Sequence, residues 1–143
     1  MHVLVPVDGS DHGWEALEYA LTYFDVDELT VLHVALPVHG AVAETDEGEY
    51  EVLPRKDALE RGEKLLEEAR ERIETHERRG DIAFSTELEV GRYAQAIVAY
   101  VEANDVDHVV MGSQGRSGLS RLVLGSVAEG VSRRSPVPVT LVR

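Results

Sequence analysis

Short apolar runs alternate with longer amphipathic stretches along the whole chain. Five of these runs are rich in Val, Leu and Ile and have the length of single β-strands. They are His2–Asp8, Leu29–Leu36, Ile82–Gly91, Asp107–Gly112 and Val137–Val142. The second run is apolar through most of its length, which is typical of a strand covered on both faces of a parallel sheet.

The stretches between these runs carry apolar residues at helical spacing, so each predicts an amphipathic helix. Ser10 or Asp11 can cap the first helix. The second is expected to run from Asp57 to about Arg79, and the fourth over Ser126–Arg134. The apolar faces of the first three consist of Trp14, Leu17, Leu21 and Phe24; of Leu59, Leu65, Leu66, Ala69 and Ile73; and of Ala94, Ile97, Val98 and Val101.

Five strands that alternate with four helices predict an α/β fold with an open sheet and right-handed crossovers. A chain of 143 residues is long enough for one such domain and too short for two, so we expect a single domain over residues 1–143. One segment, Pro37–Asp57, is acidic, contains Gly and Pro, and follows no clear period. A connection this long is expected to be a lid, a binding loop or a disordered insert.

The negative charge of the chain limits the classes of partner that it can bind. Asp and Glu outnumber Lys and Arg by 27 to 14, for a formal charge of −13, and Lys56 and Lys64 are the only lysines. Such a surface repels nucleic acid and anionic lipid headgroups, so we expect no nucleic-acid or membrane binding. Dense carboxylates with arginine in place of lysine favour a halophilic protein, because salt screens self-repulsion. An ordinary acidic protein is the alternative.

Other features bear on the cellular location. The chain has no cysteine, which excludes disulfides, thiolate metal sites and cysteine nucleophiles. No apolar run approaches the roughly 20 residues of a membrane-spanning helix. The first residues, MHVLVPVDGS, lack the basic region and cleavage site of a signal peptide. We therefore expect a cytoplasmic protein.

A glycine-rich stretch, MGSQGRSGLSRLVLGSV, begins at the end of the fourth predicted strand. Gly112, Gly115, Gly125 and Ser126 have the spacing G-x-x-G, nine residues, G-S. Glycine lets the backbone approach a phosphate, and Ser126 at a helix start offers a hydroxyl beside the helix N-terminus. Ligands bind at the carboxyl ends of strands in open α/β sheets, which favours a phosphate-binding loop. A tight turn followed by a helix cap is the structural alternative.

Other chemistries find little support in the residues. The Gly-Lys pair of a Walker A loop and the G-x-G-x-x-G of a dinucleotide fold are both missing. So are the G-x-S-x-G elbow of a serine hydrolase and the H-E-x-x-H spacing of a zinc site. Arg116 and Arg121 can pair with phosphate oxygens, or equally form surface salt bridges.

Asp8 closes the first predicted strand, in the sequence Asp-Gly-Ser. In a sheet of order 3-2-1-4-5, Asp8 and Gly112 would face one crevice at the switch point of the sheet. A carboxylate there can accept hydrogen bonds from a ribose or a base, or help to hold a metal. A turn or cap role for Asp8 is at least as well supported.

Together these residues resemble the universal stress protein family. The resemblance is carried by VPVDGS at the start, VLHV in the second strand, VVMGSQGRSGLSRLVLGSVAEGV, and the final PVPVTLVR. It covers the whole chain in order, with a variable region at Pro37–Asp57. The glycine spacing is similar to the G-2x-G-9x-G-[S/T] element of the branch of the family that binds ATP. The resemblance implies a five-stranded parallel sheet of order 3-2-1-4-5 with two helices on each face, an adenine nucleotide alpha hydrolase-like fold.

The same resemblance implies a site for ATP at the carboxyl ends of the strands. Mg²⁺ or Mn²⁺ would be bridged by the phosphates rather than held by the protein. Gln114 stands where a basic residue is frequent in the family, which weakens the expected electrostatic hold on the triphosphate. The implied nucleotide-binding residues are Pro6, Val7, Asp8 and the backbone of Val34 around the adenosine, Met111 and Gly112 beside the ribose and α-phosphate, and Gly115, Arg116, Gly125, Ser126 and Val127 around the phosphates.

The last predicted strand has nothing obvious to cover its outer edge, and an exposed apolar edge is a template for pairing with another chain. The resemblance implies a homodimer in which the last strands of two subunits pair antiparallel. We expect Val137, Val139 and Leu141 in this interface. Pro136 and Pro138 lack N–H groups, which limits the ladder bonds they can make.

These observations predict a nucleotide-dependent regulatory or stress-response protein. The alternative is a slow ATP hydrolase or nucleotide-transferring enzyme, which needs a general base or a water-positioning group near the phosphates. Asp8 is the one nearby carboxylate, and the resemblance places it at the nucleoside end, so binding is favoured over turnover. A scaffold with a vestigial site is a third alternative, against which the intact glycine spacing argues.

Overall fold

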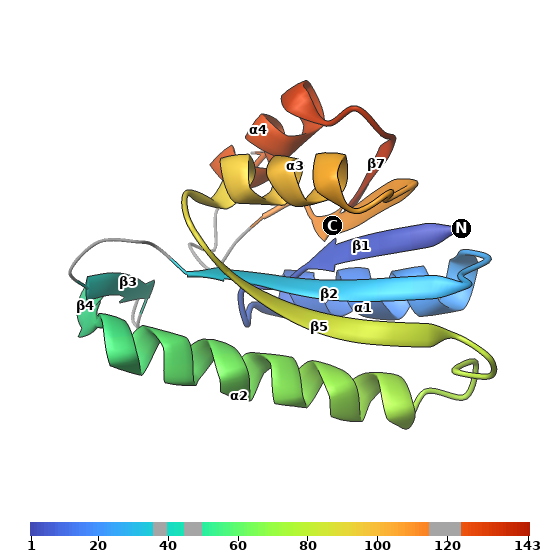
Figure 1. Cartoon of the computed structure of the whole chain (residues 1–143), viewed down its shortest axis with the longest axis horizontal. Coiled ribbons are helices and arrows are strands. Elements are labelled where there is room, and N and C mark those ends of the chain that lie inside the picture. The colour runs from blue at the N-terminus through green and yellow to red at the C-terminus, as the bar shows by residue number, and fades with distance from the viewer. Residues whose placement is uncertain (36–39, 45–49, 115–123) are drawn as a thin grey trace.

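The computed structural model describes residues 1–35, 40–44, 50–114 and 124–143, and within 40–44 and 50–54 it describes the backbone alone. The main sheet has five parallel strands in the order β5-β2-β1-β6-β7 (Figure 1). Counted along the chain without the β3–β4 pair, this is the order 3-2-1-4-5, so the predicted fold class is confirmed. The strands are β1 (His2–Pro6), β2 (Glu28–Ala35), β3 (Gly40–Glu44), β4 (Tyr50–Pro54), β5 (Ala83–Val90), β6 (His108–Gly112) and β7 (Val139–Val142); the helices are α1 (Asp11–Tyr23), α2 (Arg55–Glu74), α3 (Tyr93–Ala103) and α4 (Ser126–Arg134).

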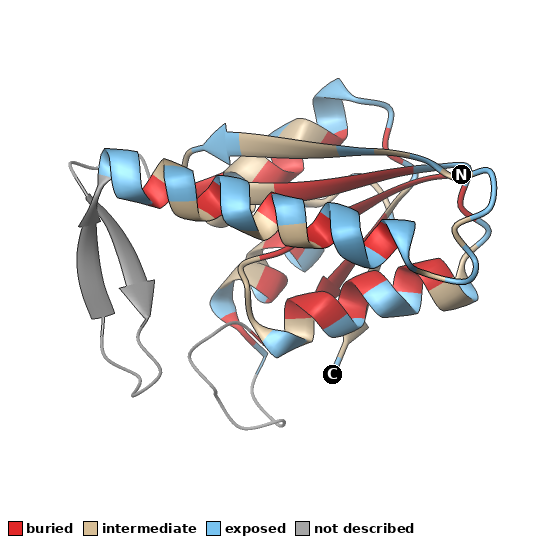
Figure 2. Cartoon of the chain, turned by 90° about the horizontal axis from the view of Figure 1, so that it is seen from below, coloured by how far each residue is buried: buried red, intermediate tan, exposed pale blue. Residues whose placement is uncertain are grey.

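Two helices cover each face of the main sheet. Helices α1 and α2 pack on one face and α3 and α4 on the other (Figure 1). Successive residues of a strand point to opposite faces, so Val3 and Val5 pack with α1 and α2, whereas Leu4 packs with α3 and α4. Figure 2 shows the result: the inner strands are largely buried, while the helices are buried along one side. This double cover explains the apolar sequence of β2.

The helices follow the predicted pattern, with one difference in length. The Ser10 hydroxyl caps α1 by accepting a hydrogen bond from the Gly13 N–H at 3.3 Å. Helix α2 ends at Glu74 rather than near Arg79. Beyond it, the His76 N–H donates to the Ile73 carbonyl at 3.1 Å, a bond spanning three residues that tightens the chain into turns. No helix within the described ranges is long and apolar enough to cross a bilayer.

The acidic segment Pro37–Asp57 is more regular than predicted. Gly40–Glu44 and Tyr50–Pro54 pair as an antiparallel hairpin, and α2 begins directly after it at Arg55. In Figure 1 this hairpin lies beyond the carboxyl end of β2, beside the start of α2. Each of its strands has only five residues, too few for a periodic pattern to stand out between Gly, Pro and Glu. Residues 36–39 and 45–49 lie outside the described residues.

Candidate functional site

The candidate site lies where the carboxyl ends of the central strands meet, on the left in Figure 1. Strands β1, β2 and β6 are neighbours in the sheet and run parallel, so their ends share one edge. This edge contains the switch point at which successive crossovers change direction, the usual ligand position in such sheets. Nine of the implied residues stand along it or at the adjoining start of α4: Pro6, Val7, Asp8, Val34, Met111, Gly112, Gly125, Ser126 and Val127. Gly115 and Arg116 lie outside the described residues.

The ladder between β1 and β2 ends within the site. The Val7 N–H donates to the Leu32 carbonyl at 2.9 Å. The Val7 carbonyl accepts a hydrogen bond from His33 Nδ1 at 2.9 Å, so this nitrogen carries the proton. Among the described residues, no backbone bond joins the Val34 N–H to the Val7 carbonyl. A side chain has therefore taken the place of the next rung of the ladder.

The last hydrogen bond of the β1–β2 ladder indicates where the Val34 backbone groups point. Backbone groups of alternate residues in a strand point to the same side. The Leu32 carbonyl points toward β1, so the Val34 N–H and carbonyl also point that way, into the space past the end of β1. The site therefore presents a backbone donor beside a backbone acceptor.

Asp8 forms the turn that leads into α1. Its Oδ1 accepts a hydrogen bond from the Ser10 N–H at 2.9 Å, so the turn role considered for Asp8 is confirmed. Burial raises the pKa of the Tyr93 hydroxyl, and the negative charge of Asp8 raises it further. Tyr93 is the first residue of α3, which places a phenol near the Asp8 carboxylate at the same edge.

Gly112 is needed by the packing of β6 against α1. A Cβ at this position would lie 2.8 Å from His12 Cβ and 3.0 Å from the His12 carbonyl carbon and oxygen. The close approach is thus to the protein itself, which is a structural reason for glycine here. His12 Nδ1 is buried and has no hydrogen-bond partner among the residues that the structure describes.

Ser113 joins the end of the sheet to the start of α4. Its N–H donates to the Val142 carbonyl at 2.8 Å, and its carbonyl accepts from the Gly125 N–H at 2.8 Å. Gly125 is the N-cap of α4 and makes no side-chain cap bond. Ser126 is therefore the first residue of the helix, whereas the structural alternative had assigned it as the cap. The N–H groups of the first turn have no partner within the helix, and they are available to an anion.

Three side chains at this edge were not predicted from the sequence: His33, Tyr93 and His12. His33 acts on a residue 26 positions away in the chain, a separation that no local pattern reveals. Tyr93 could have been noticed because it follows the carboxyl end of a predicted strand. Within the described ranges, no group of three or more His, Asp or Glu side chains is arranged to hold a metal ion.

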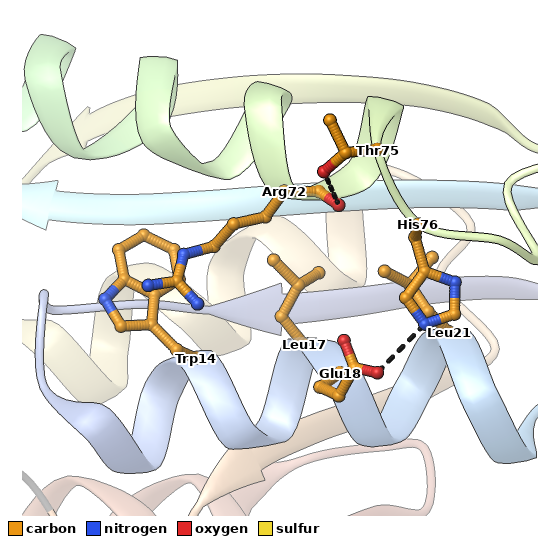
Figure 3. A pocket seen from close by; sticks show the side chains of 7 residues that line it. All are labelled: Trp14, Leu17, Glu18, Leu21, Arg72, Thr75 and His76. Carbon is orange, nitrogen blue, oxygen red and sulfur yellow. Dashed lines mark hydrogen bonds and ion pairs between the residues drawn. The ribbon is translucent and has the colours of Figure 1, made fainter.

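A cavity of about 220 Å³ lies elsewhere, between α1 and α2 (Figure 3). Its polar side chains already have partners within the protein. His76 Nε2 donates to Glu18 Oε1 at 3.0 Å, while its Nδ1 accepts from the Arg78 N–H. The Arg72 guanidinium lies 4.5 Å above the centre of the Trp14 ring. These contacts hold two helices together, so we assign the cavity to helix packing. Its lining residues are Trp14, Leu17, Glu18, Leu21, Arg72, Thr75 and His76.

Comparison with known proteins agrees with the fold just described. The model of the universal stress protein family matches residues 1–143. The chain belongs to this family. It is 32% identical to universal stress protein MJ0531 of Methanocaldococcus jannaschii, over 99% of this chain and 81% of that protein.

Two solved structures share the fold of this universal stress protein. One is a universal stress protein in complex with cAMP, 23% identical with a TM-score of 0.68, covering 100% of this chain and 97% of the other. The second is a family member from Arabidopsis thaliana with AMP bound, 18% identical with a TM-score of 0.66, covering 99% and 90%. Structural neighbours of the chain thus bind adenine nucleotides.

Proposed function

We propose that this universal stress protein binds ATP at the carboxyl edge of its main sheet and acts as a nucleotide-dependent regulatory or stress-response protein. The observation that carries the proposal is the end of the β1–β2 ladder, which leaves the Val34 N–H and carbonyl pointing into the site. Adenine matches this pair, because its N6–H₂ is a donor next to the acceptor N1. Guanine presents the opposite order, with O6 an acceptor, and would meet the pair only with its ring turned over.

Two further features fit the rest of the nucleotide. The Asp8 carboxylate accepts one backbone hydrogen bond through Oδ1 and has capacity to accept others from ribose hydroxyls. The uncapped first turn of α4, at Ser126 and Val127, offers N–H groups and the positive end of the helix dipole to phosphates. Gly115 and Arg116 complete the proposed set. Mg²⁺ or Mn²⁺ would bind to the phosphates and would neutralise part of their charge.

Binding is favoured over turnover as the activity of this site. Hydrolysis needs a group that positions or deprotonates a water near the phosphates. Asp8 and Tyr93 are at the end of the site assigned to the nucleoside, while the first turn of α4 contributes backbone N–H groups. A slow ATP hydrolase or nucleotide-transferring enzyme remains the second candidate. Purification in high salt, rapid quenching and mass spectrometry of the extracted ligand distinguishes the two: ATP supports binding, and ADP or AMP supports turnover.

The proposed phosphate position is tested by replacing Gly125. Gly125 is buried and has φ −63°, so a valine is tolerated by the backbone but places a branched side chain beside the first turn of α4. We expect the G125V variant to bind Mg-ATP at least about tenfold more weakly, by the loss of more than one hydrogen bond. An unchanged Kd, measured by isothermal titration calorimetry, would show that the phosphates bind elsewhere.

We also propose that two copies pair through β7. This strand has β6 as a neighbour on one side, and no other strand of the described sheet lies on its outer side. Val137, Val139 and Leu141 are partly buried against the α3–α4 core, so pairing would use backbone groups and the exposed parts of these side chains. Light scattering at high salt tests the proposal. A monomeric mass across the accessible protein concentrations would refute it.

The chain has a formal charge of −13. We propose that the protein is adapted to high salt, as in a halophile. Screening by salt weakens repulsion among the carboxylates. The dependence of thermal stability on salt concentration tests this adaptation separately from nucleotide binding.

A further inference from the structure

His33 occupies an unusual place in the sheet. Its backbone belongs to β2, where it is paired in register with Leu88 of β5. Its side chain reaches in the other direction, to the carbonyl of Val7 just past the end of β1. The His33 ring therefore bridges the two strands whose ends form the proposed adenine pocket.

We propose that His33 is a positioning residue that keeps the Val34 N–H available for the base. In an uninterrupted parallel ladder, the Val34 N–H would donate to the Val7 carbonyl, just as the Val7 N–H donates to the Leu32 carbonyl. His33 Nδ1 donates to that carbonyl instead, at 2.9 Å. A buried carbonyl that lacks a partner is costly, so the carbonyl and a free backbone donor can coexist at this edge only if another group satisfies the carbonyl.

Helix α2 supports the ring from the opposite side. A Cβ on Gly62 would lie 2.9 Å from His33 Cδ2 and 3.5 Å from His33 Nε2. It would also lie 2.8 Å from Leu88 Cδ1. The bare backbone of Gly62 thus gives the ring the space in which it reaches Val7, and α2 becomes part of the arrangement that shapes the site.

The first test needs no ligand and uses amide hydrogen exchange of Val34, followed by NMR. In H33L the donor is lost, the ladder can close by one rung, and the Val34 N–H is expected to exchange about fivefold to tenfold more slowly. In H33N the Asn Nδ2 occupies the position of His Nδ1 and can still donate, so Val34 should exchange as in the native protein. Equal exchange in all three proteins, or slow exchange in H33N, would overturn the proposal.

A second variant leaves the histidine in place. In G62A the added methyl crowds the His33 ring at Cδ2 and Nε2, so the ring has to turn out of the position in which Nδ1 reaches the Val7 carbonyl. The Val34 N–H is then expected to exchange several-fold more slowly. The crowded atoms belong to side chains, which can move, unlike the backbone atoms of His12 beside Gly112. The substitution also raises helix propensity, so a folded protein is expected even if H33L is too unstable to study. Unchanged exchange of Val34 in G62A, with the His33 ring resonances displaced, would refute the role assigned to the ring.

A binding test rests on the proposed function and separates the two claims. H33L is expected to bind Mg-ATP about fivefold to tenfold more weakly and to bind inorganic triphosphate as the native protein does, because triphosphate does not contact Val34. H33N should retain the native affinity for both. Equal weakening toward ATP and triphosphate in H33L would overturn the positioning role. If the native protein bound neither probe, the proposed function would fail, while the exchange measurement would still decide the role of His33.

Discussion

Replacing Gly112 with alanine is expected to strain the contact between β6 and α1. The new Cβ would lie 2.8 Å from His12 Cβ and 3.0 Å from the His12 carbonyl atoms. These atoms belong to the backbone, or are attached directly to it, in the first turn of a helix. They cannot turn aside as the tip of a long side chain can, so the strand or the helix must move.

The magnitude follows from two opposing contributions. Overpacking of this kind costs about 1–3 kcal/mol. The alanine also reduces the freedom of the unfolded chain, which stabilises the fold by about 0.4–1 kcal/mol. Taken at the middle of each range, these contributions lower the free energy of unfolding of G112A by about 1–2 kcal/mol. At about 2–4 °C per kcal/mol for a chain of this size, the Tm should fall by about 2–8 °C.

Urea unfolding followed by circular dichroism measures this change, and Gly91 provides a matched control. Gly91 follows the end of β5, and a Cβ there would lie 3.4 Å from Ala96 Cβ, a distance close to ordinary contact. G91A should thus show the gain from the unfolded chain without the strain, for a small rise in stability. Equal unfolding free energies for G112A and G91A would refute the account of Gly112.

Three further predictions follow from charge and titration. D8N removes a negative charge that raises the pKa of Tyr93, so spectrophotometric titration should find that pKa lowered, though still raised by burial; an unchanged pKa would contradict the proximity of the two groups. Burial lowers the pKa of His108 from 6.5. As the pH falls below 6.5, the His108 side chain is therefore protonated more readily in the unfolded chain than in the native fold. The native fold loses stability over this pH range. H108Q should lessen this loss in urea unfolding, and an equal pH dependence in both proteins would refute the assignment. Because the formal charge is −13, added KCl should raise the Tm, and a Tm independent of KCl would count against adaptation to high salt.

The main sheet and its helices could be predicted from the sequence because apolar residues recur at clearly different spacings in the strands and in the helices. The order of the strands came from the resemblance to the family and agrees with the structure. The β3–β4 hairpin could not be predicted, since two strands of five residues leave too short a pattern. The end of α2 at Glu74 was missed because the residues beyond it continue to favour a helix, while hydrogen bonds in the turn end it.

Only the position of the candidate site in the fold could be predicted from the sequence. The carboxyl ends of the strands, Asp8 and the glycine spacing were sufficient to locate it. The reasons for individual residues depend on contacts between distant parts of the chain, as Gly112 with His12 and His33 with Val7 show. Such contacts are set by the packing of whole elements, so no local pattern could reveal them.

The most direct test of the account is a titration of ¹⁵N-labelled protein with Mg-ATP, followed by amide chemical shifts. Binding at the proposed site should shift the amides of Val34, Asp8, Gly125 and Ser126 together, with one Kd, and GTP should shift the Val34 amide less. Inorganic triphosphate should shift the amides at the start of α4 and leave Val34 unchanged. No shift at millimolar Mg-ATP, or shifts confined to the cavity between α1 and α2, would contradict the central claim.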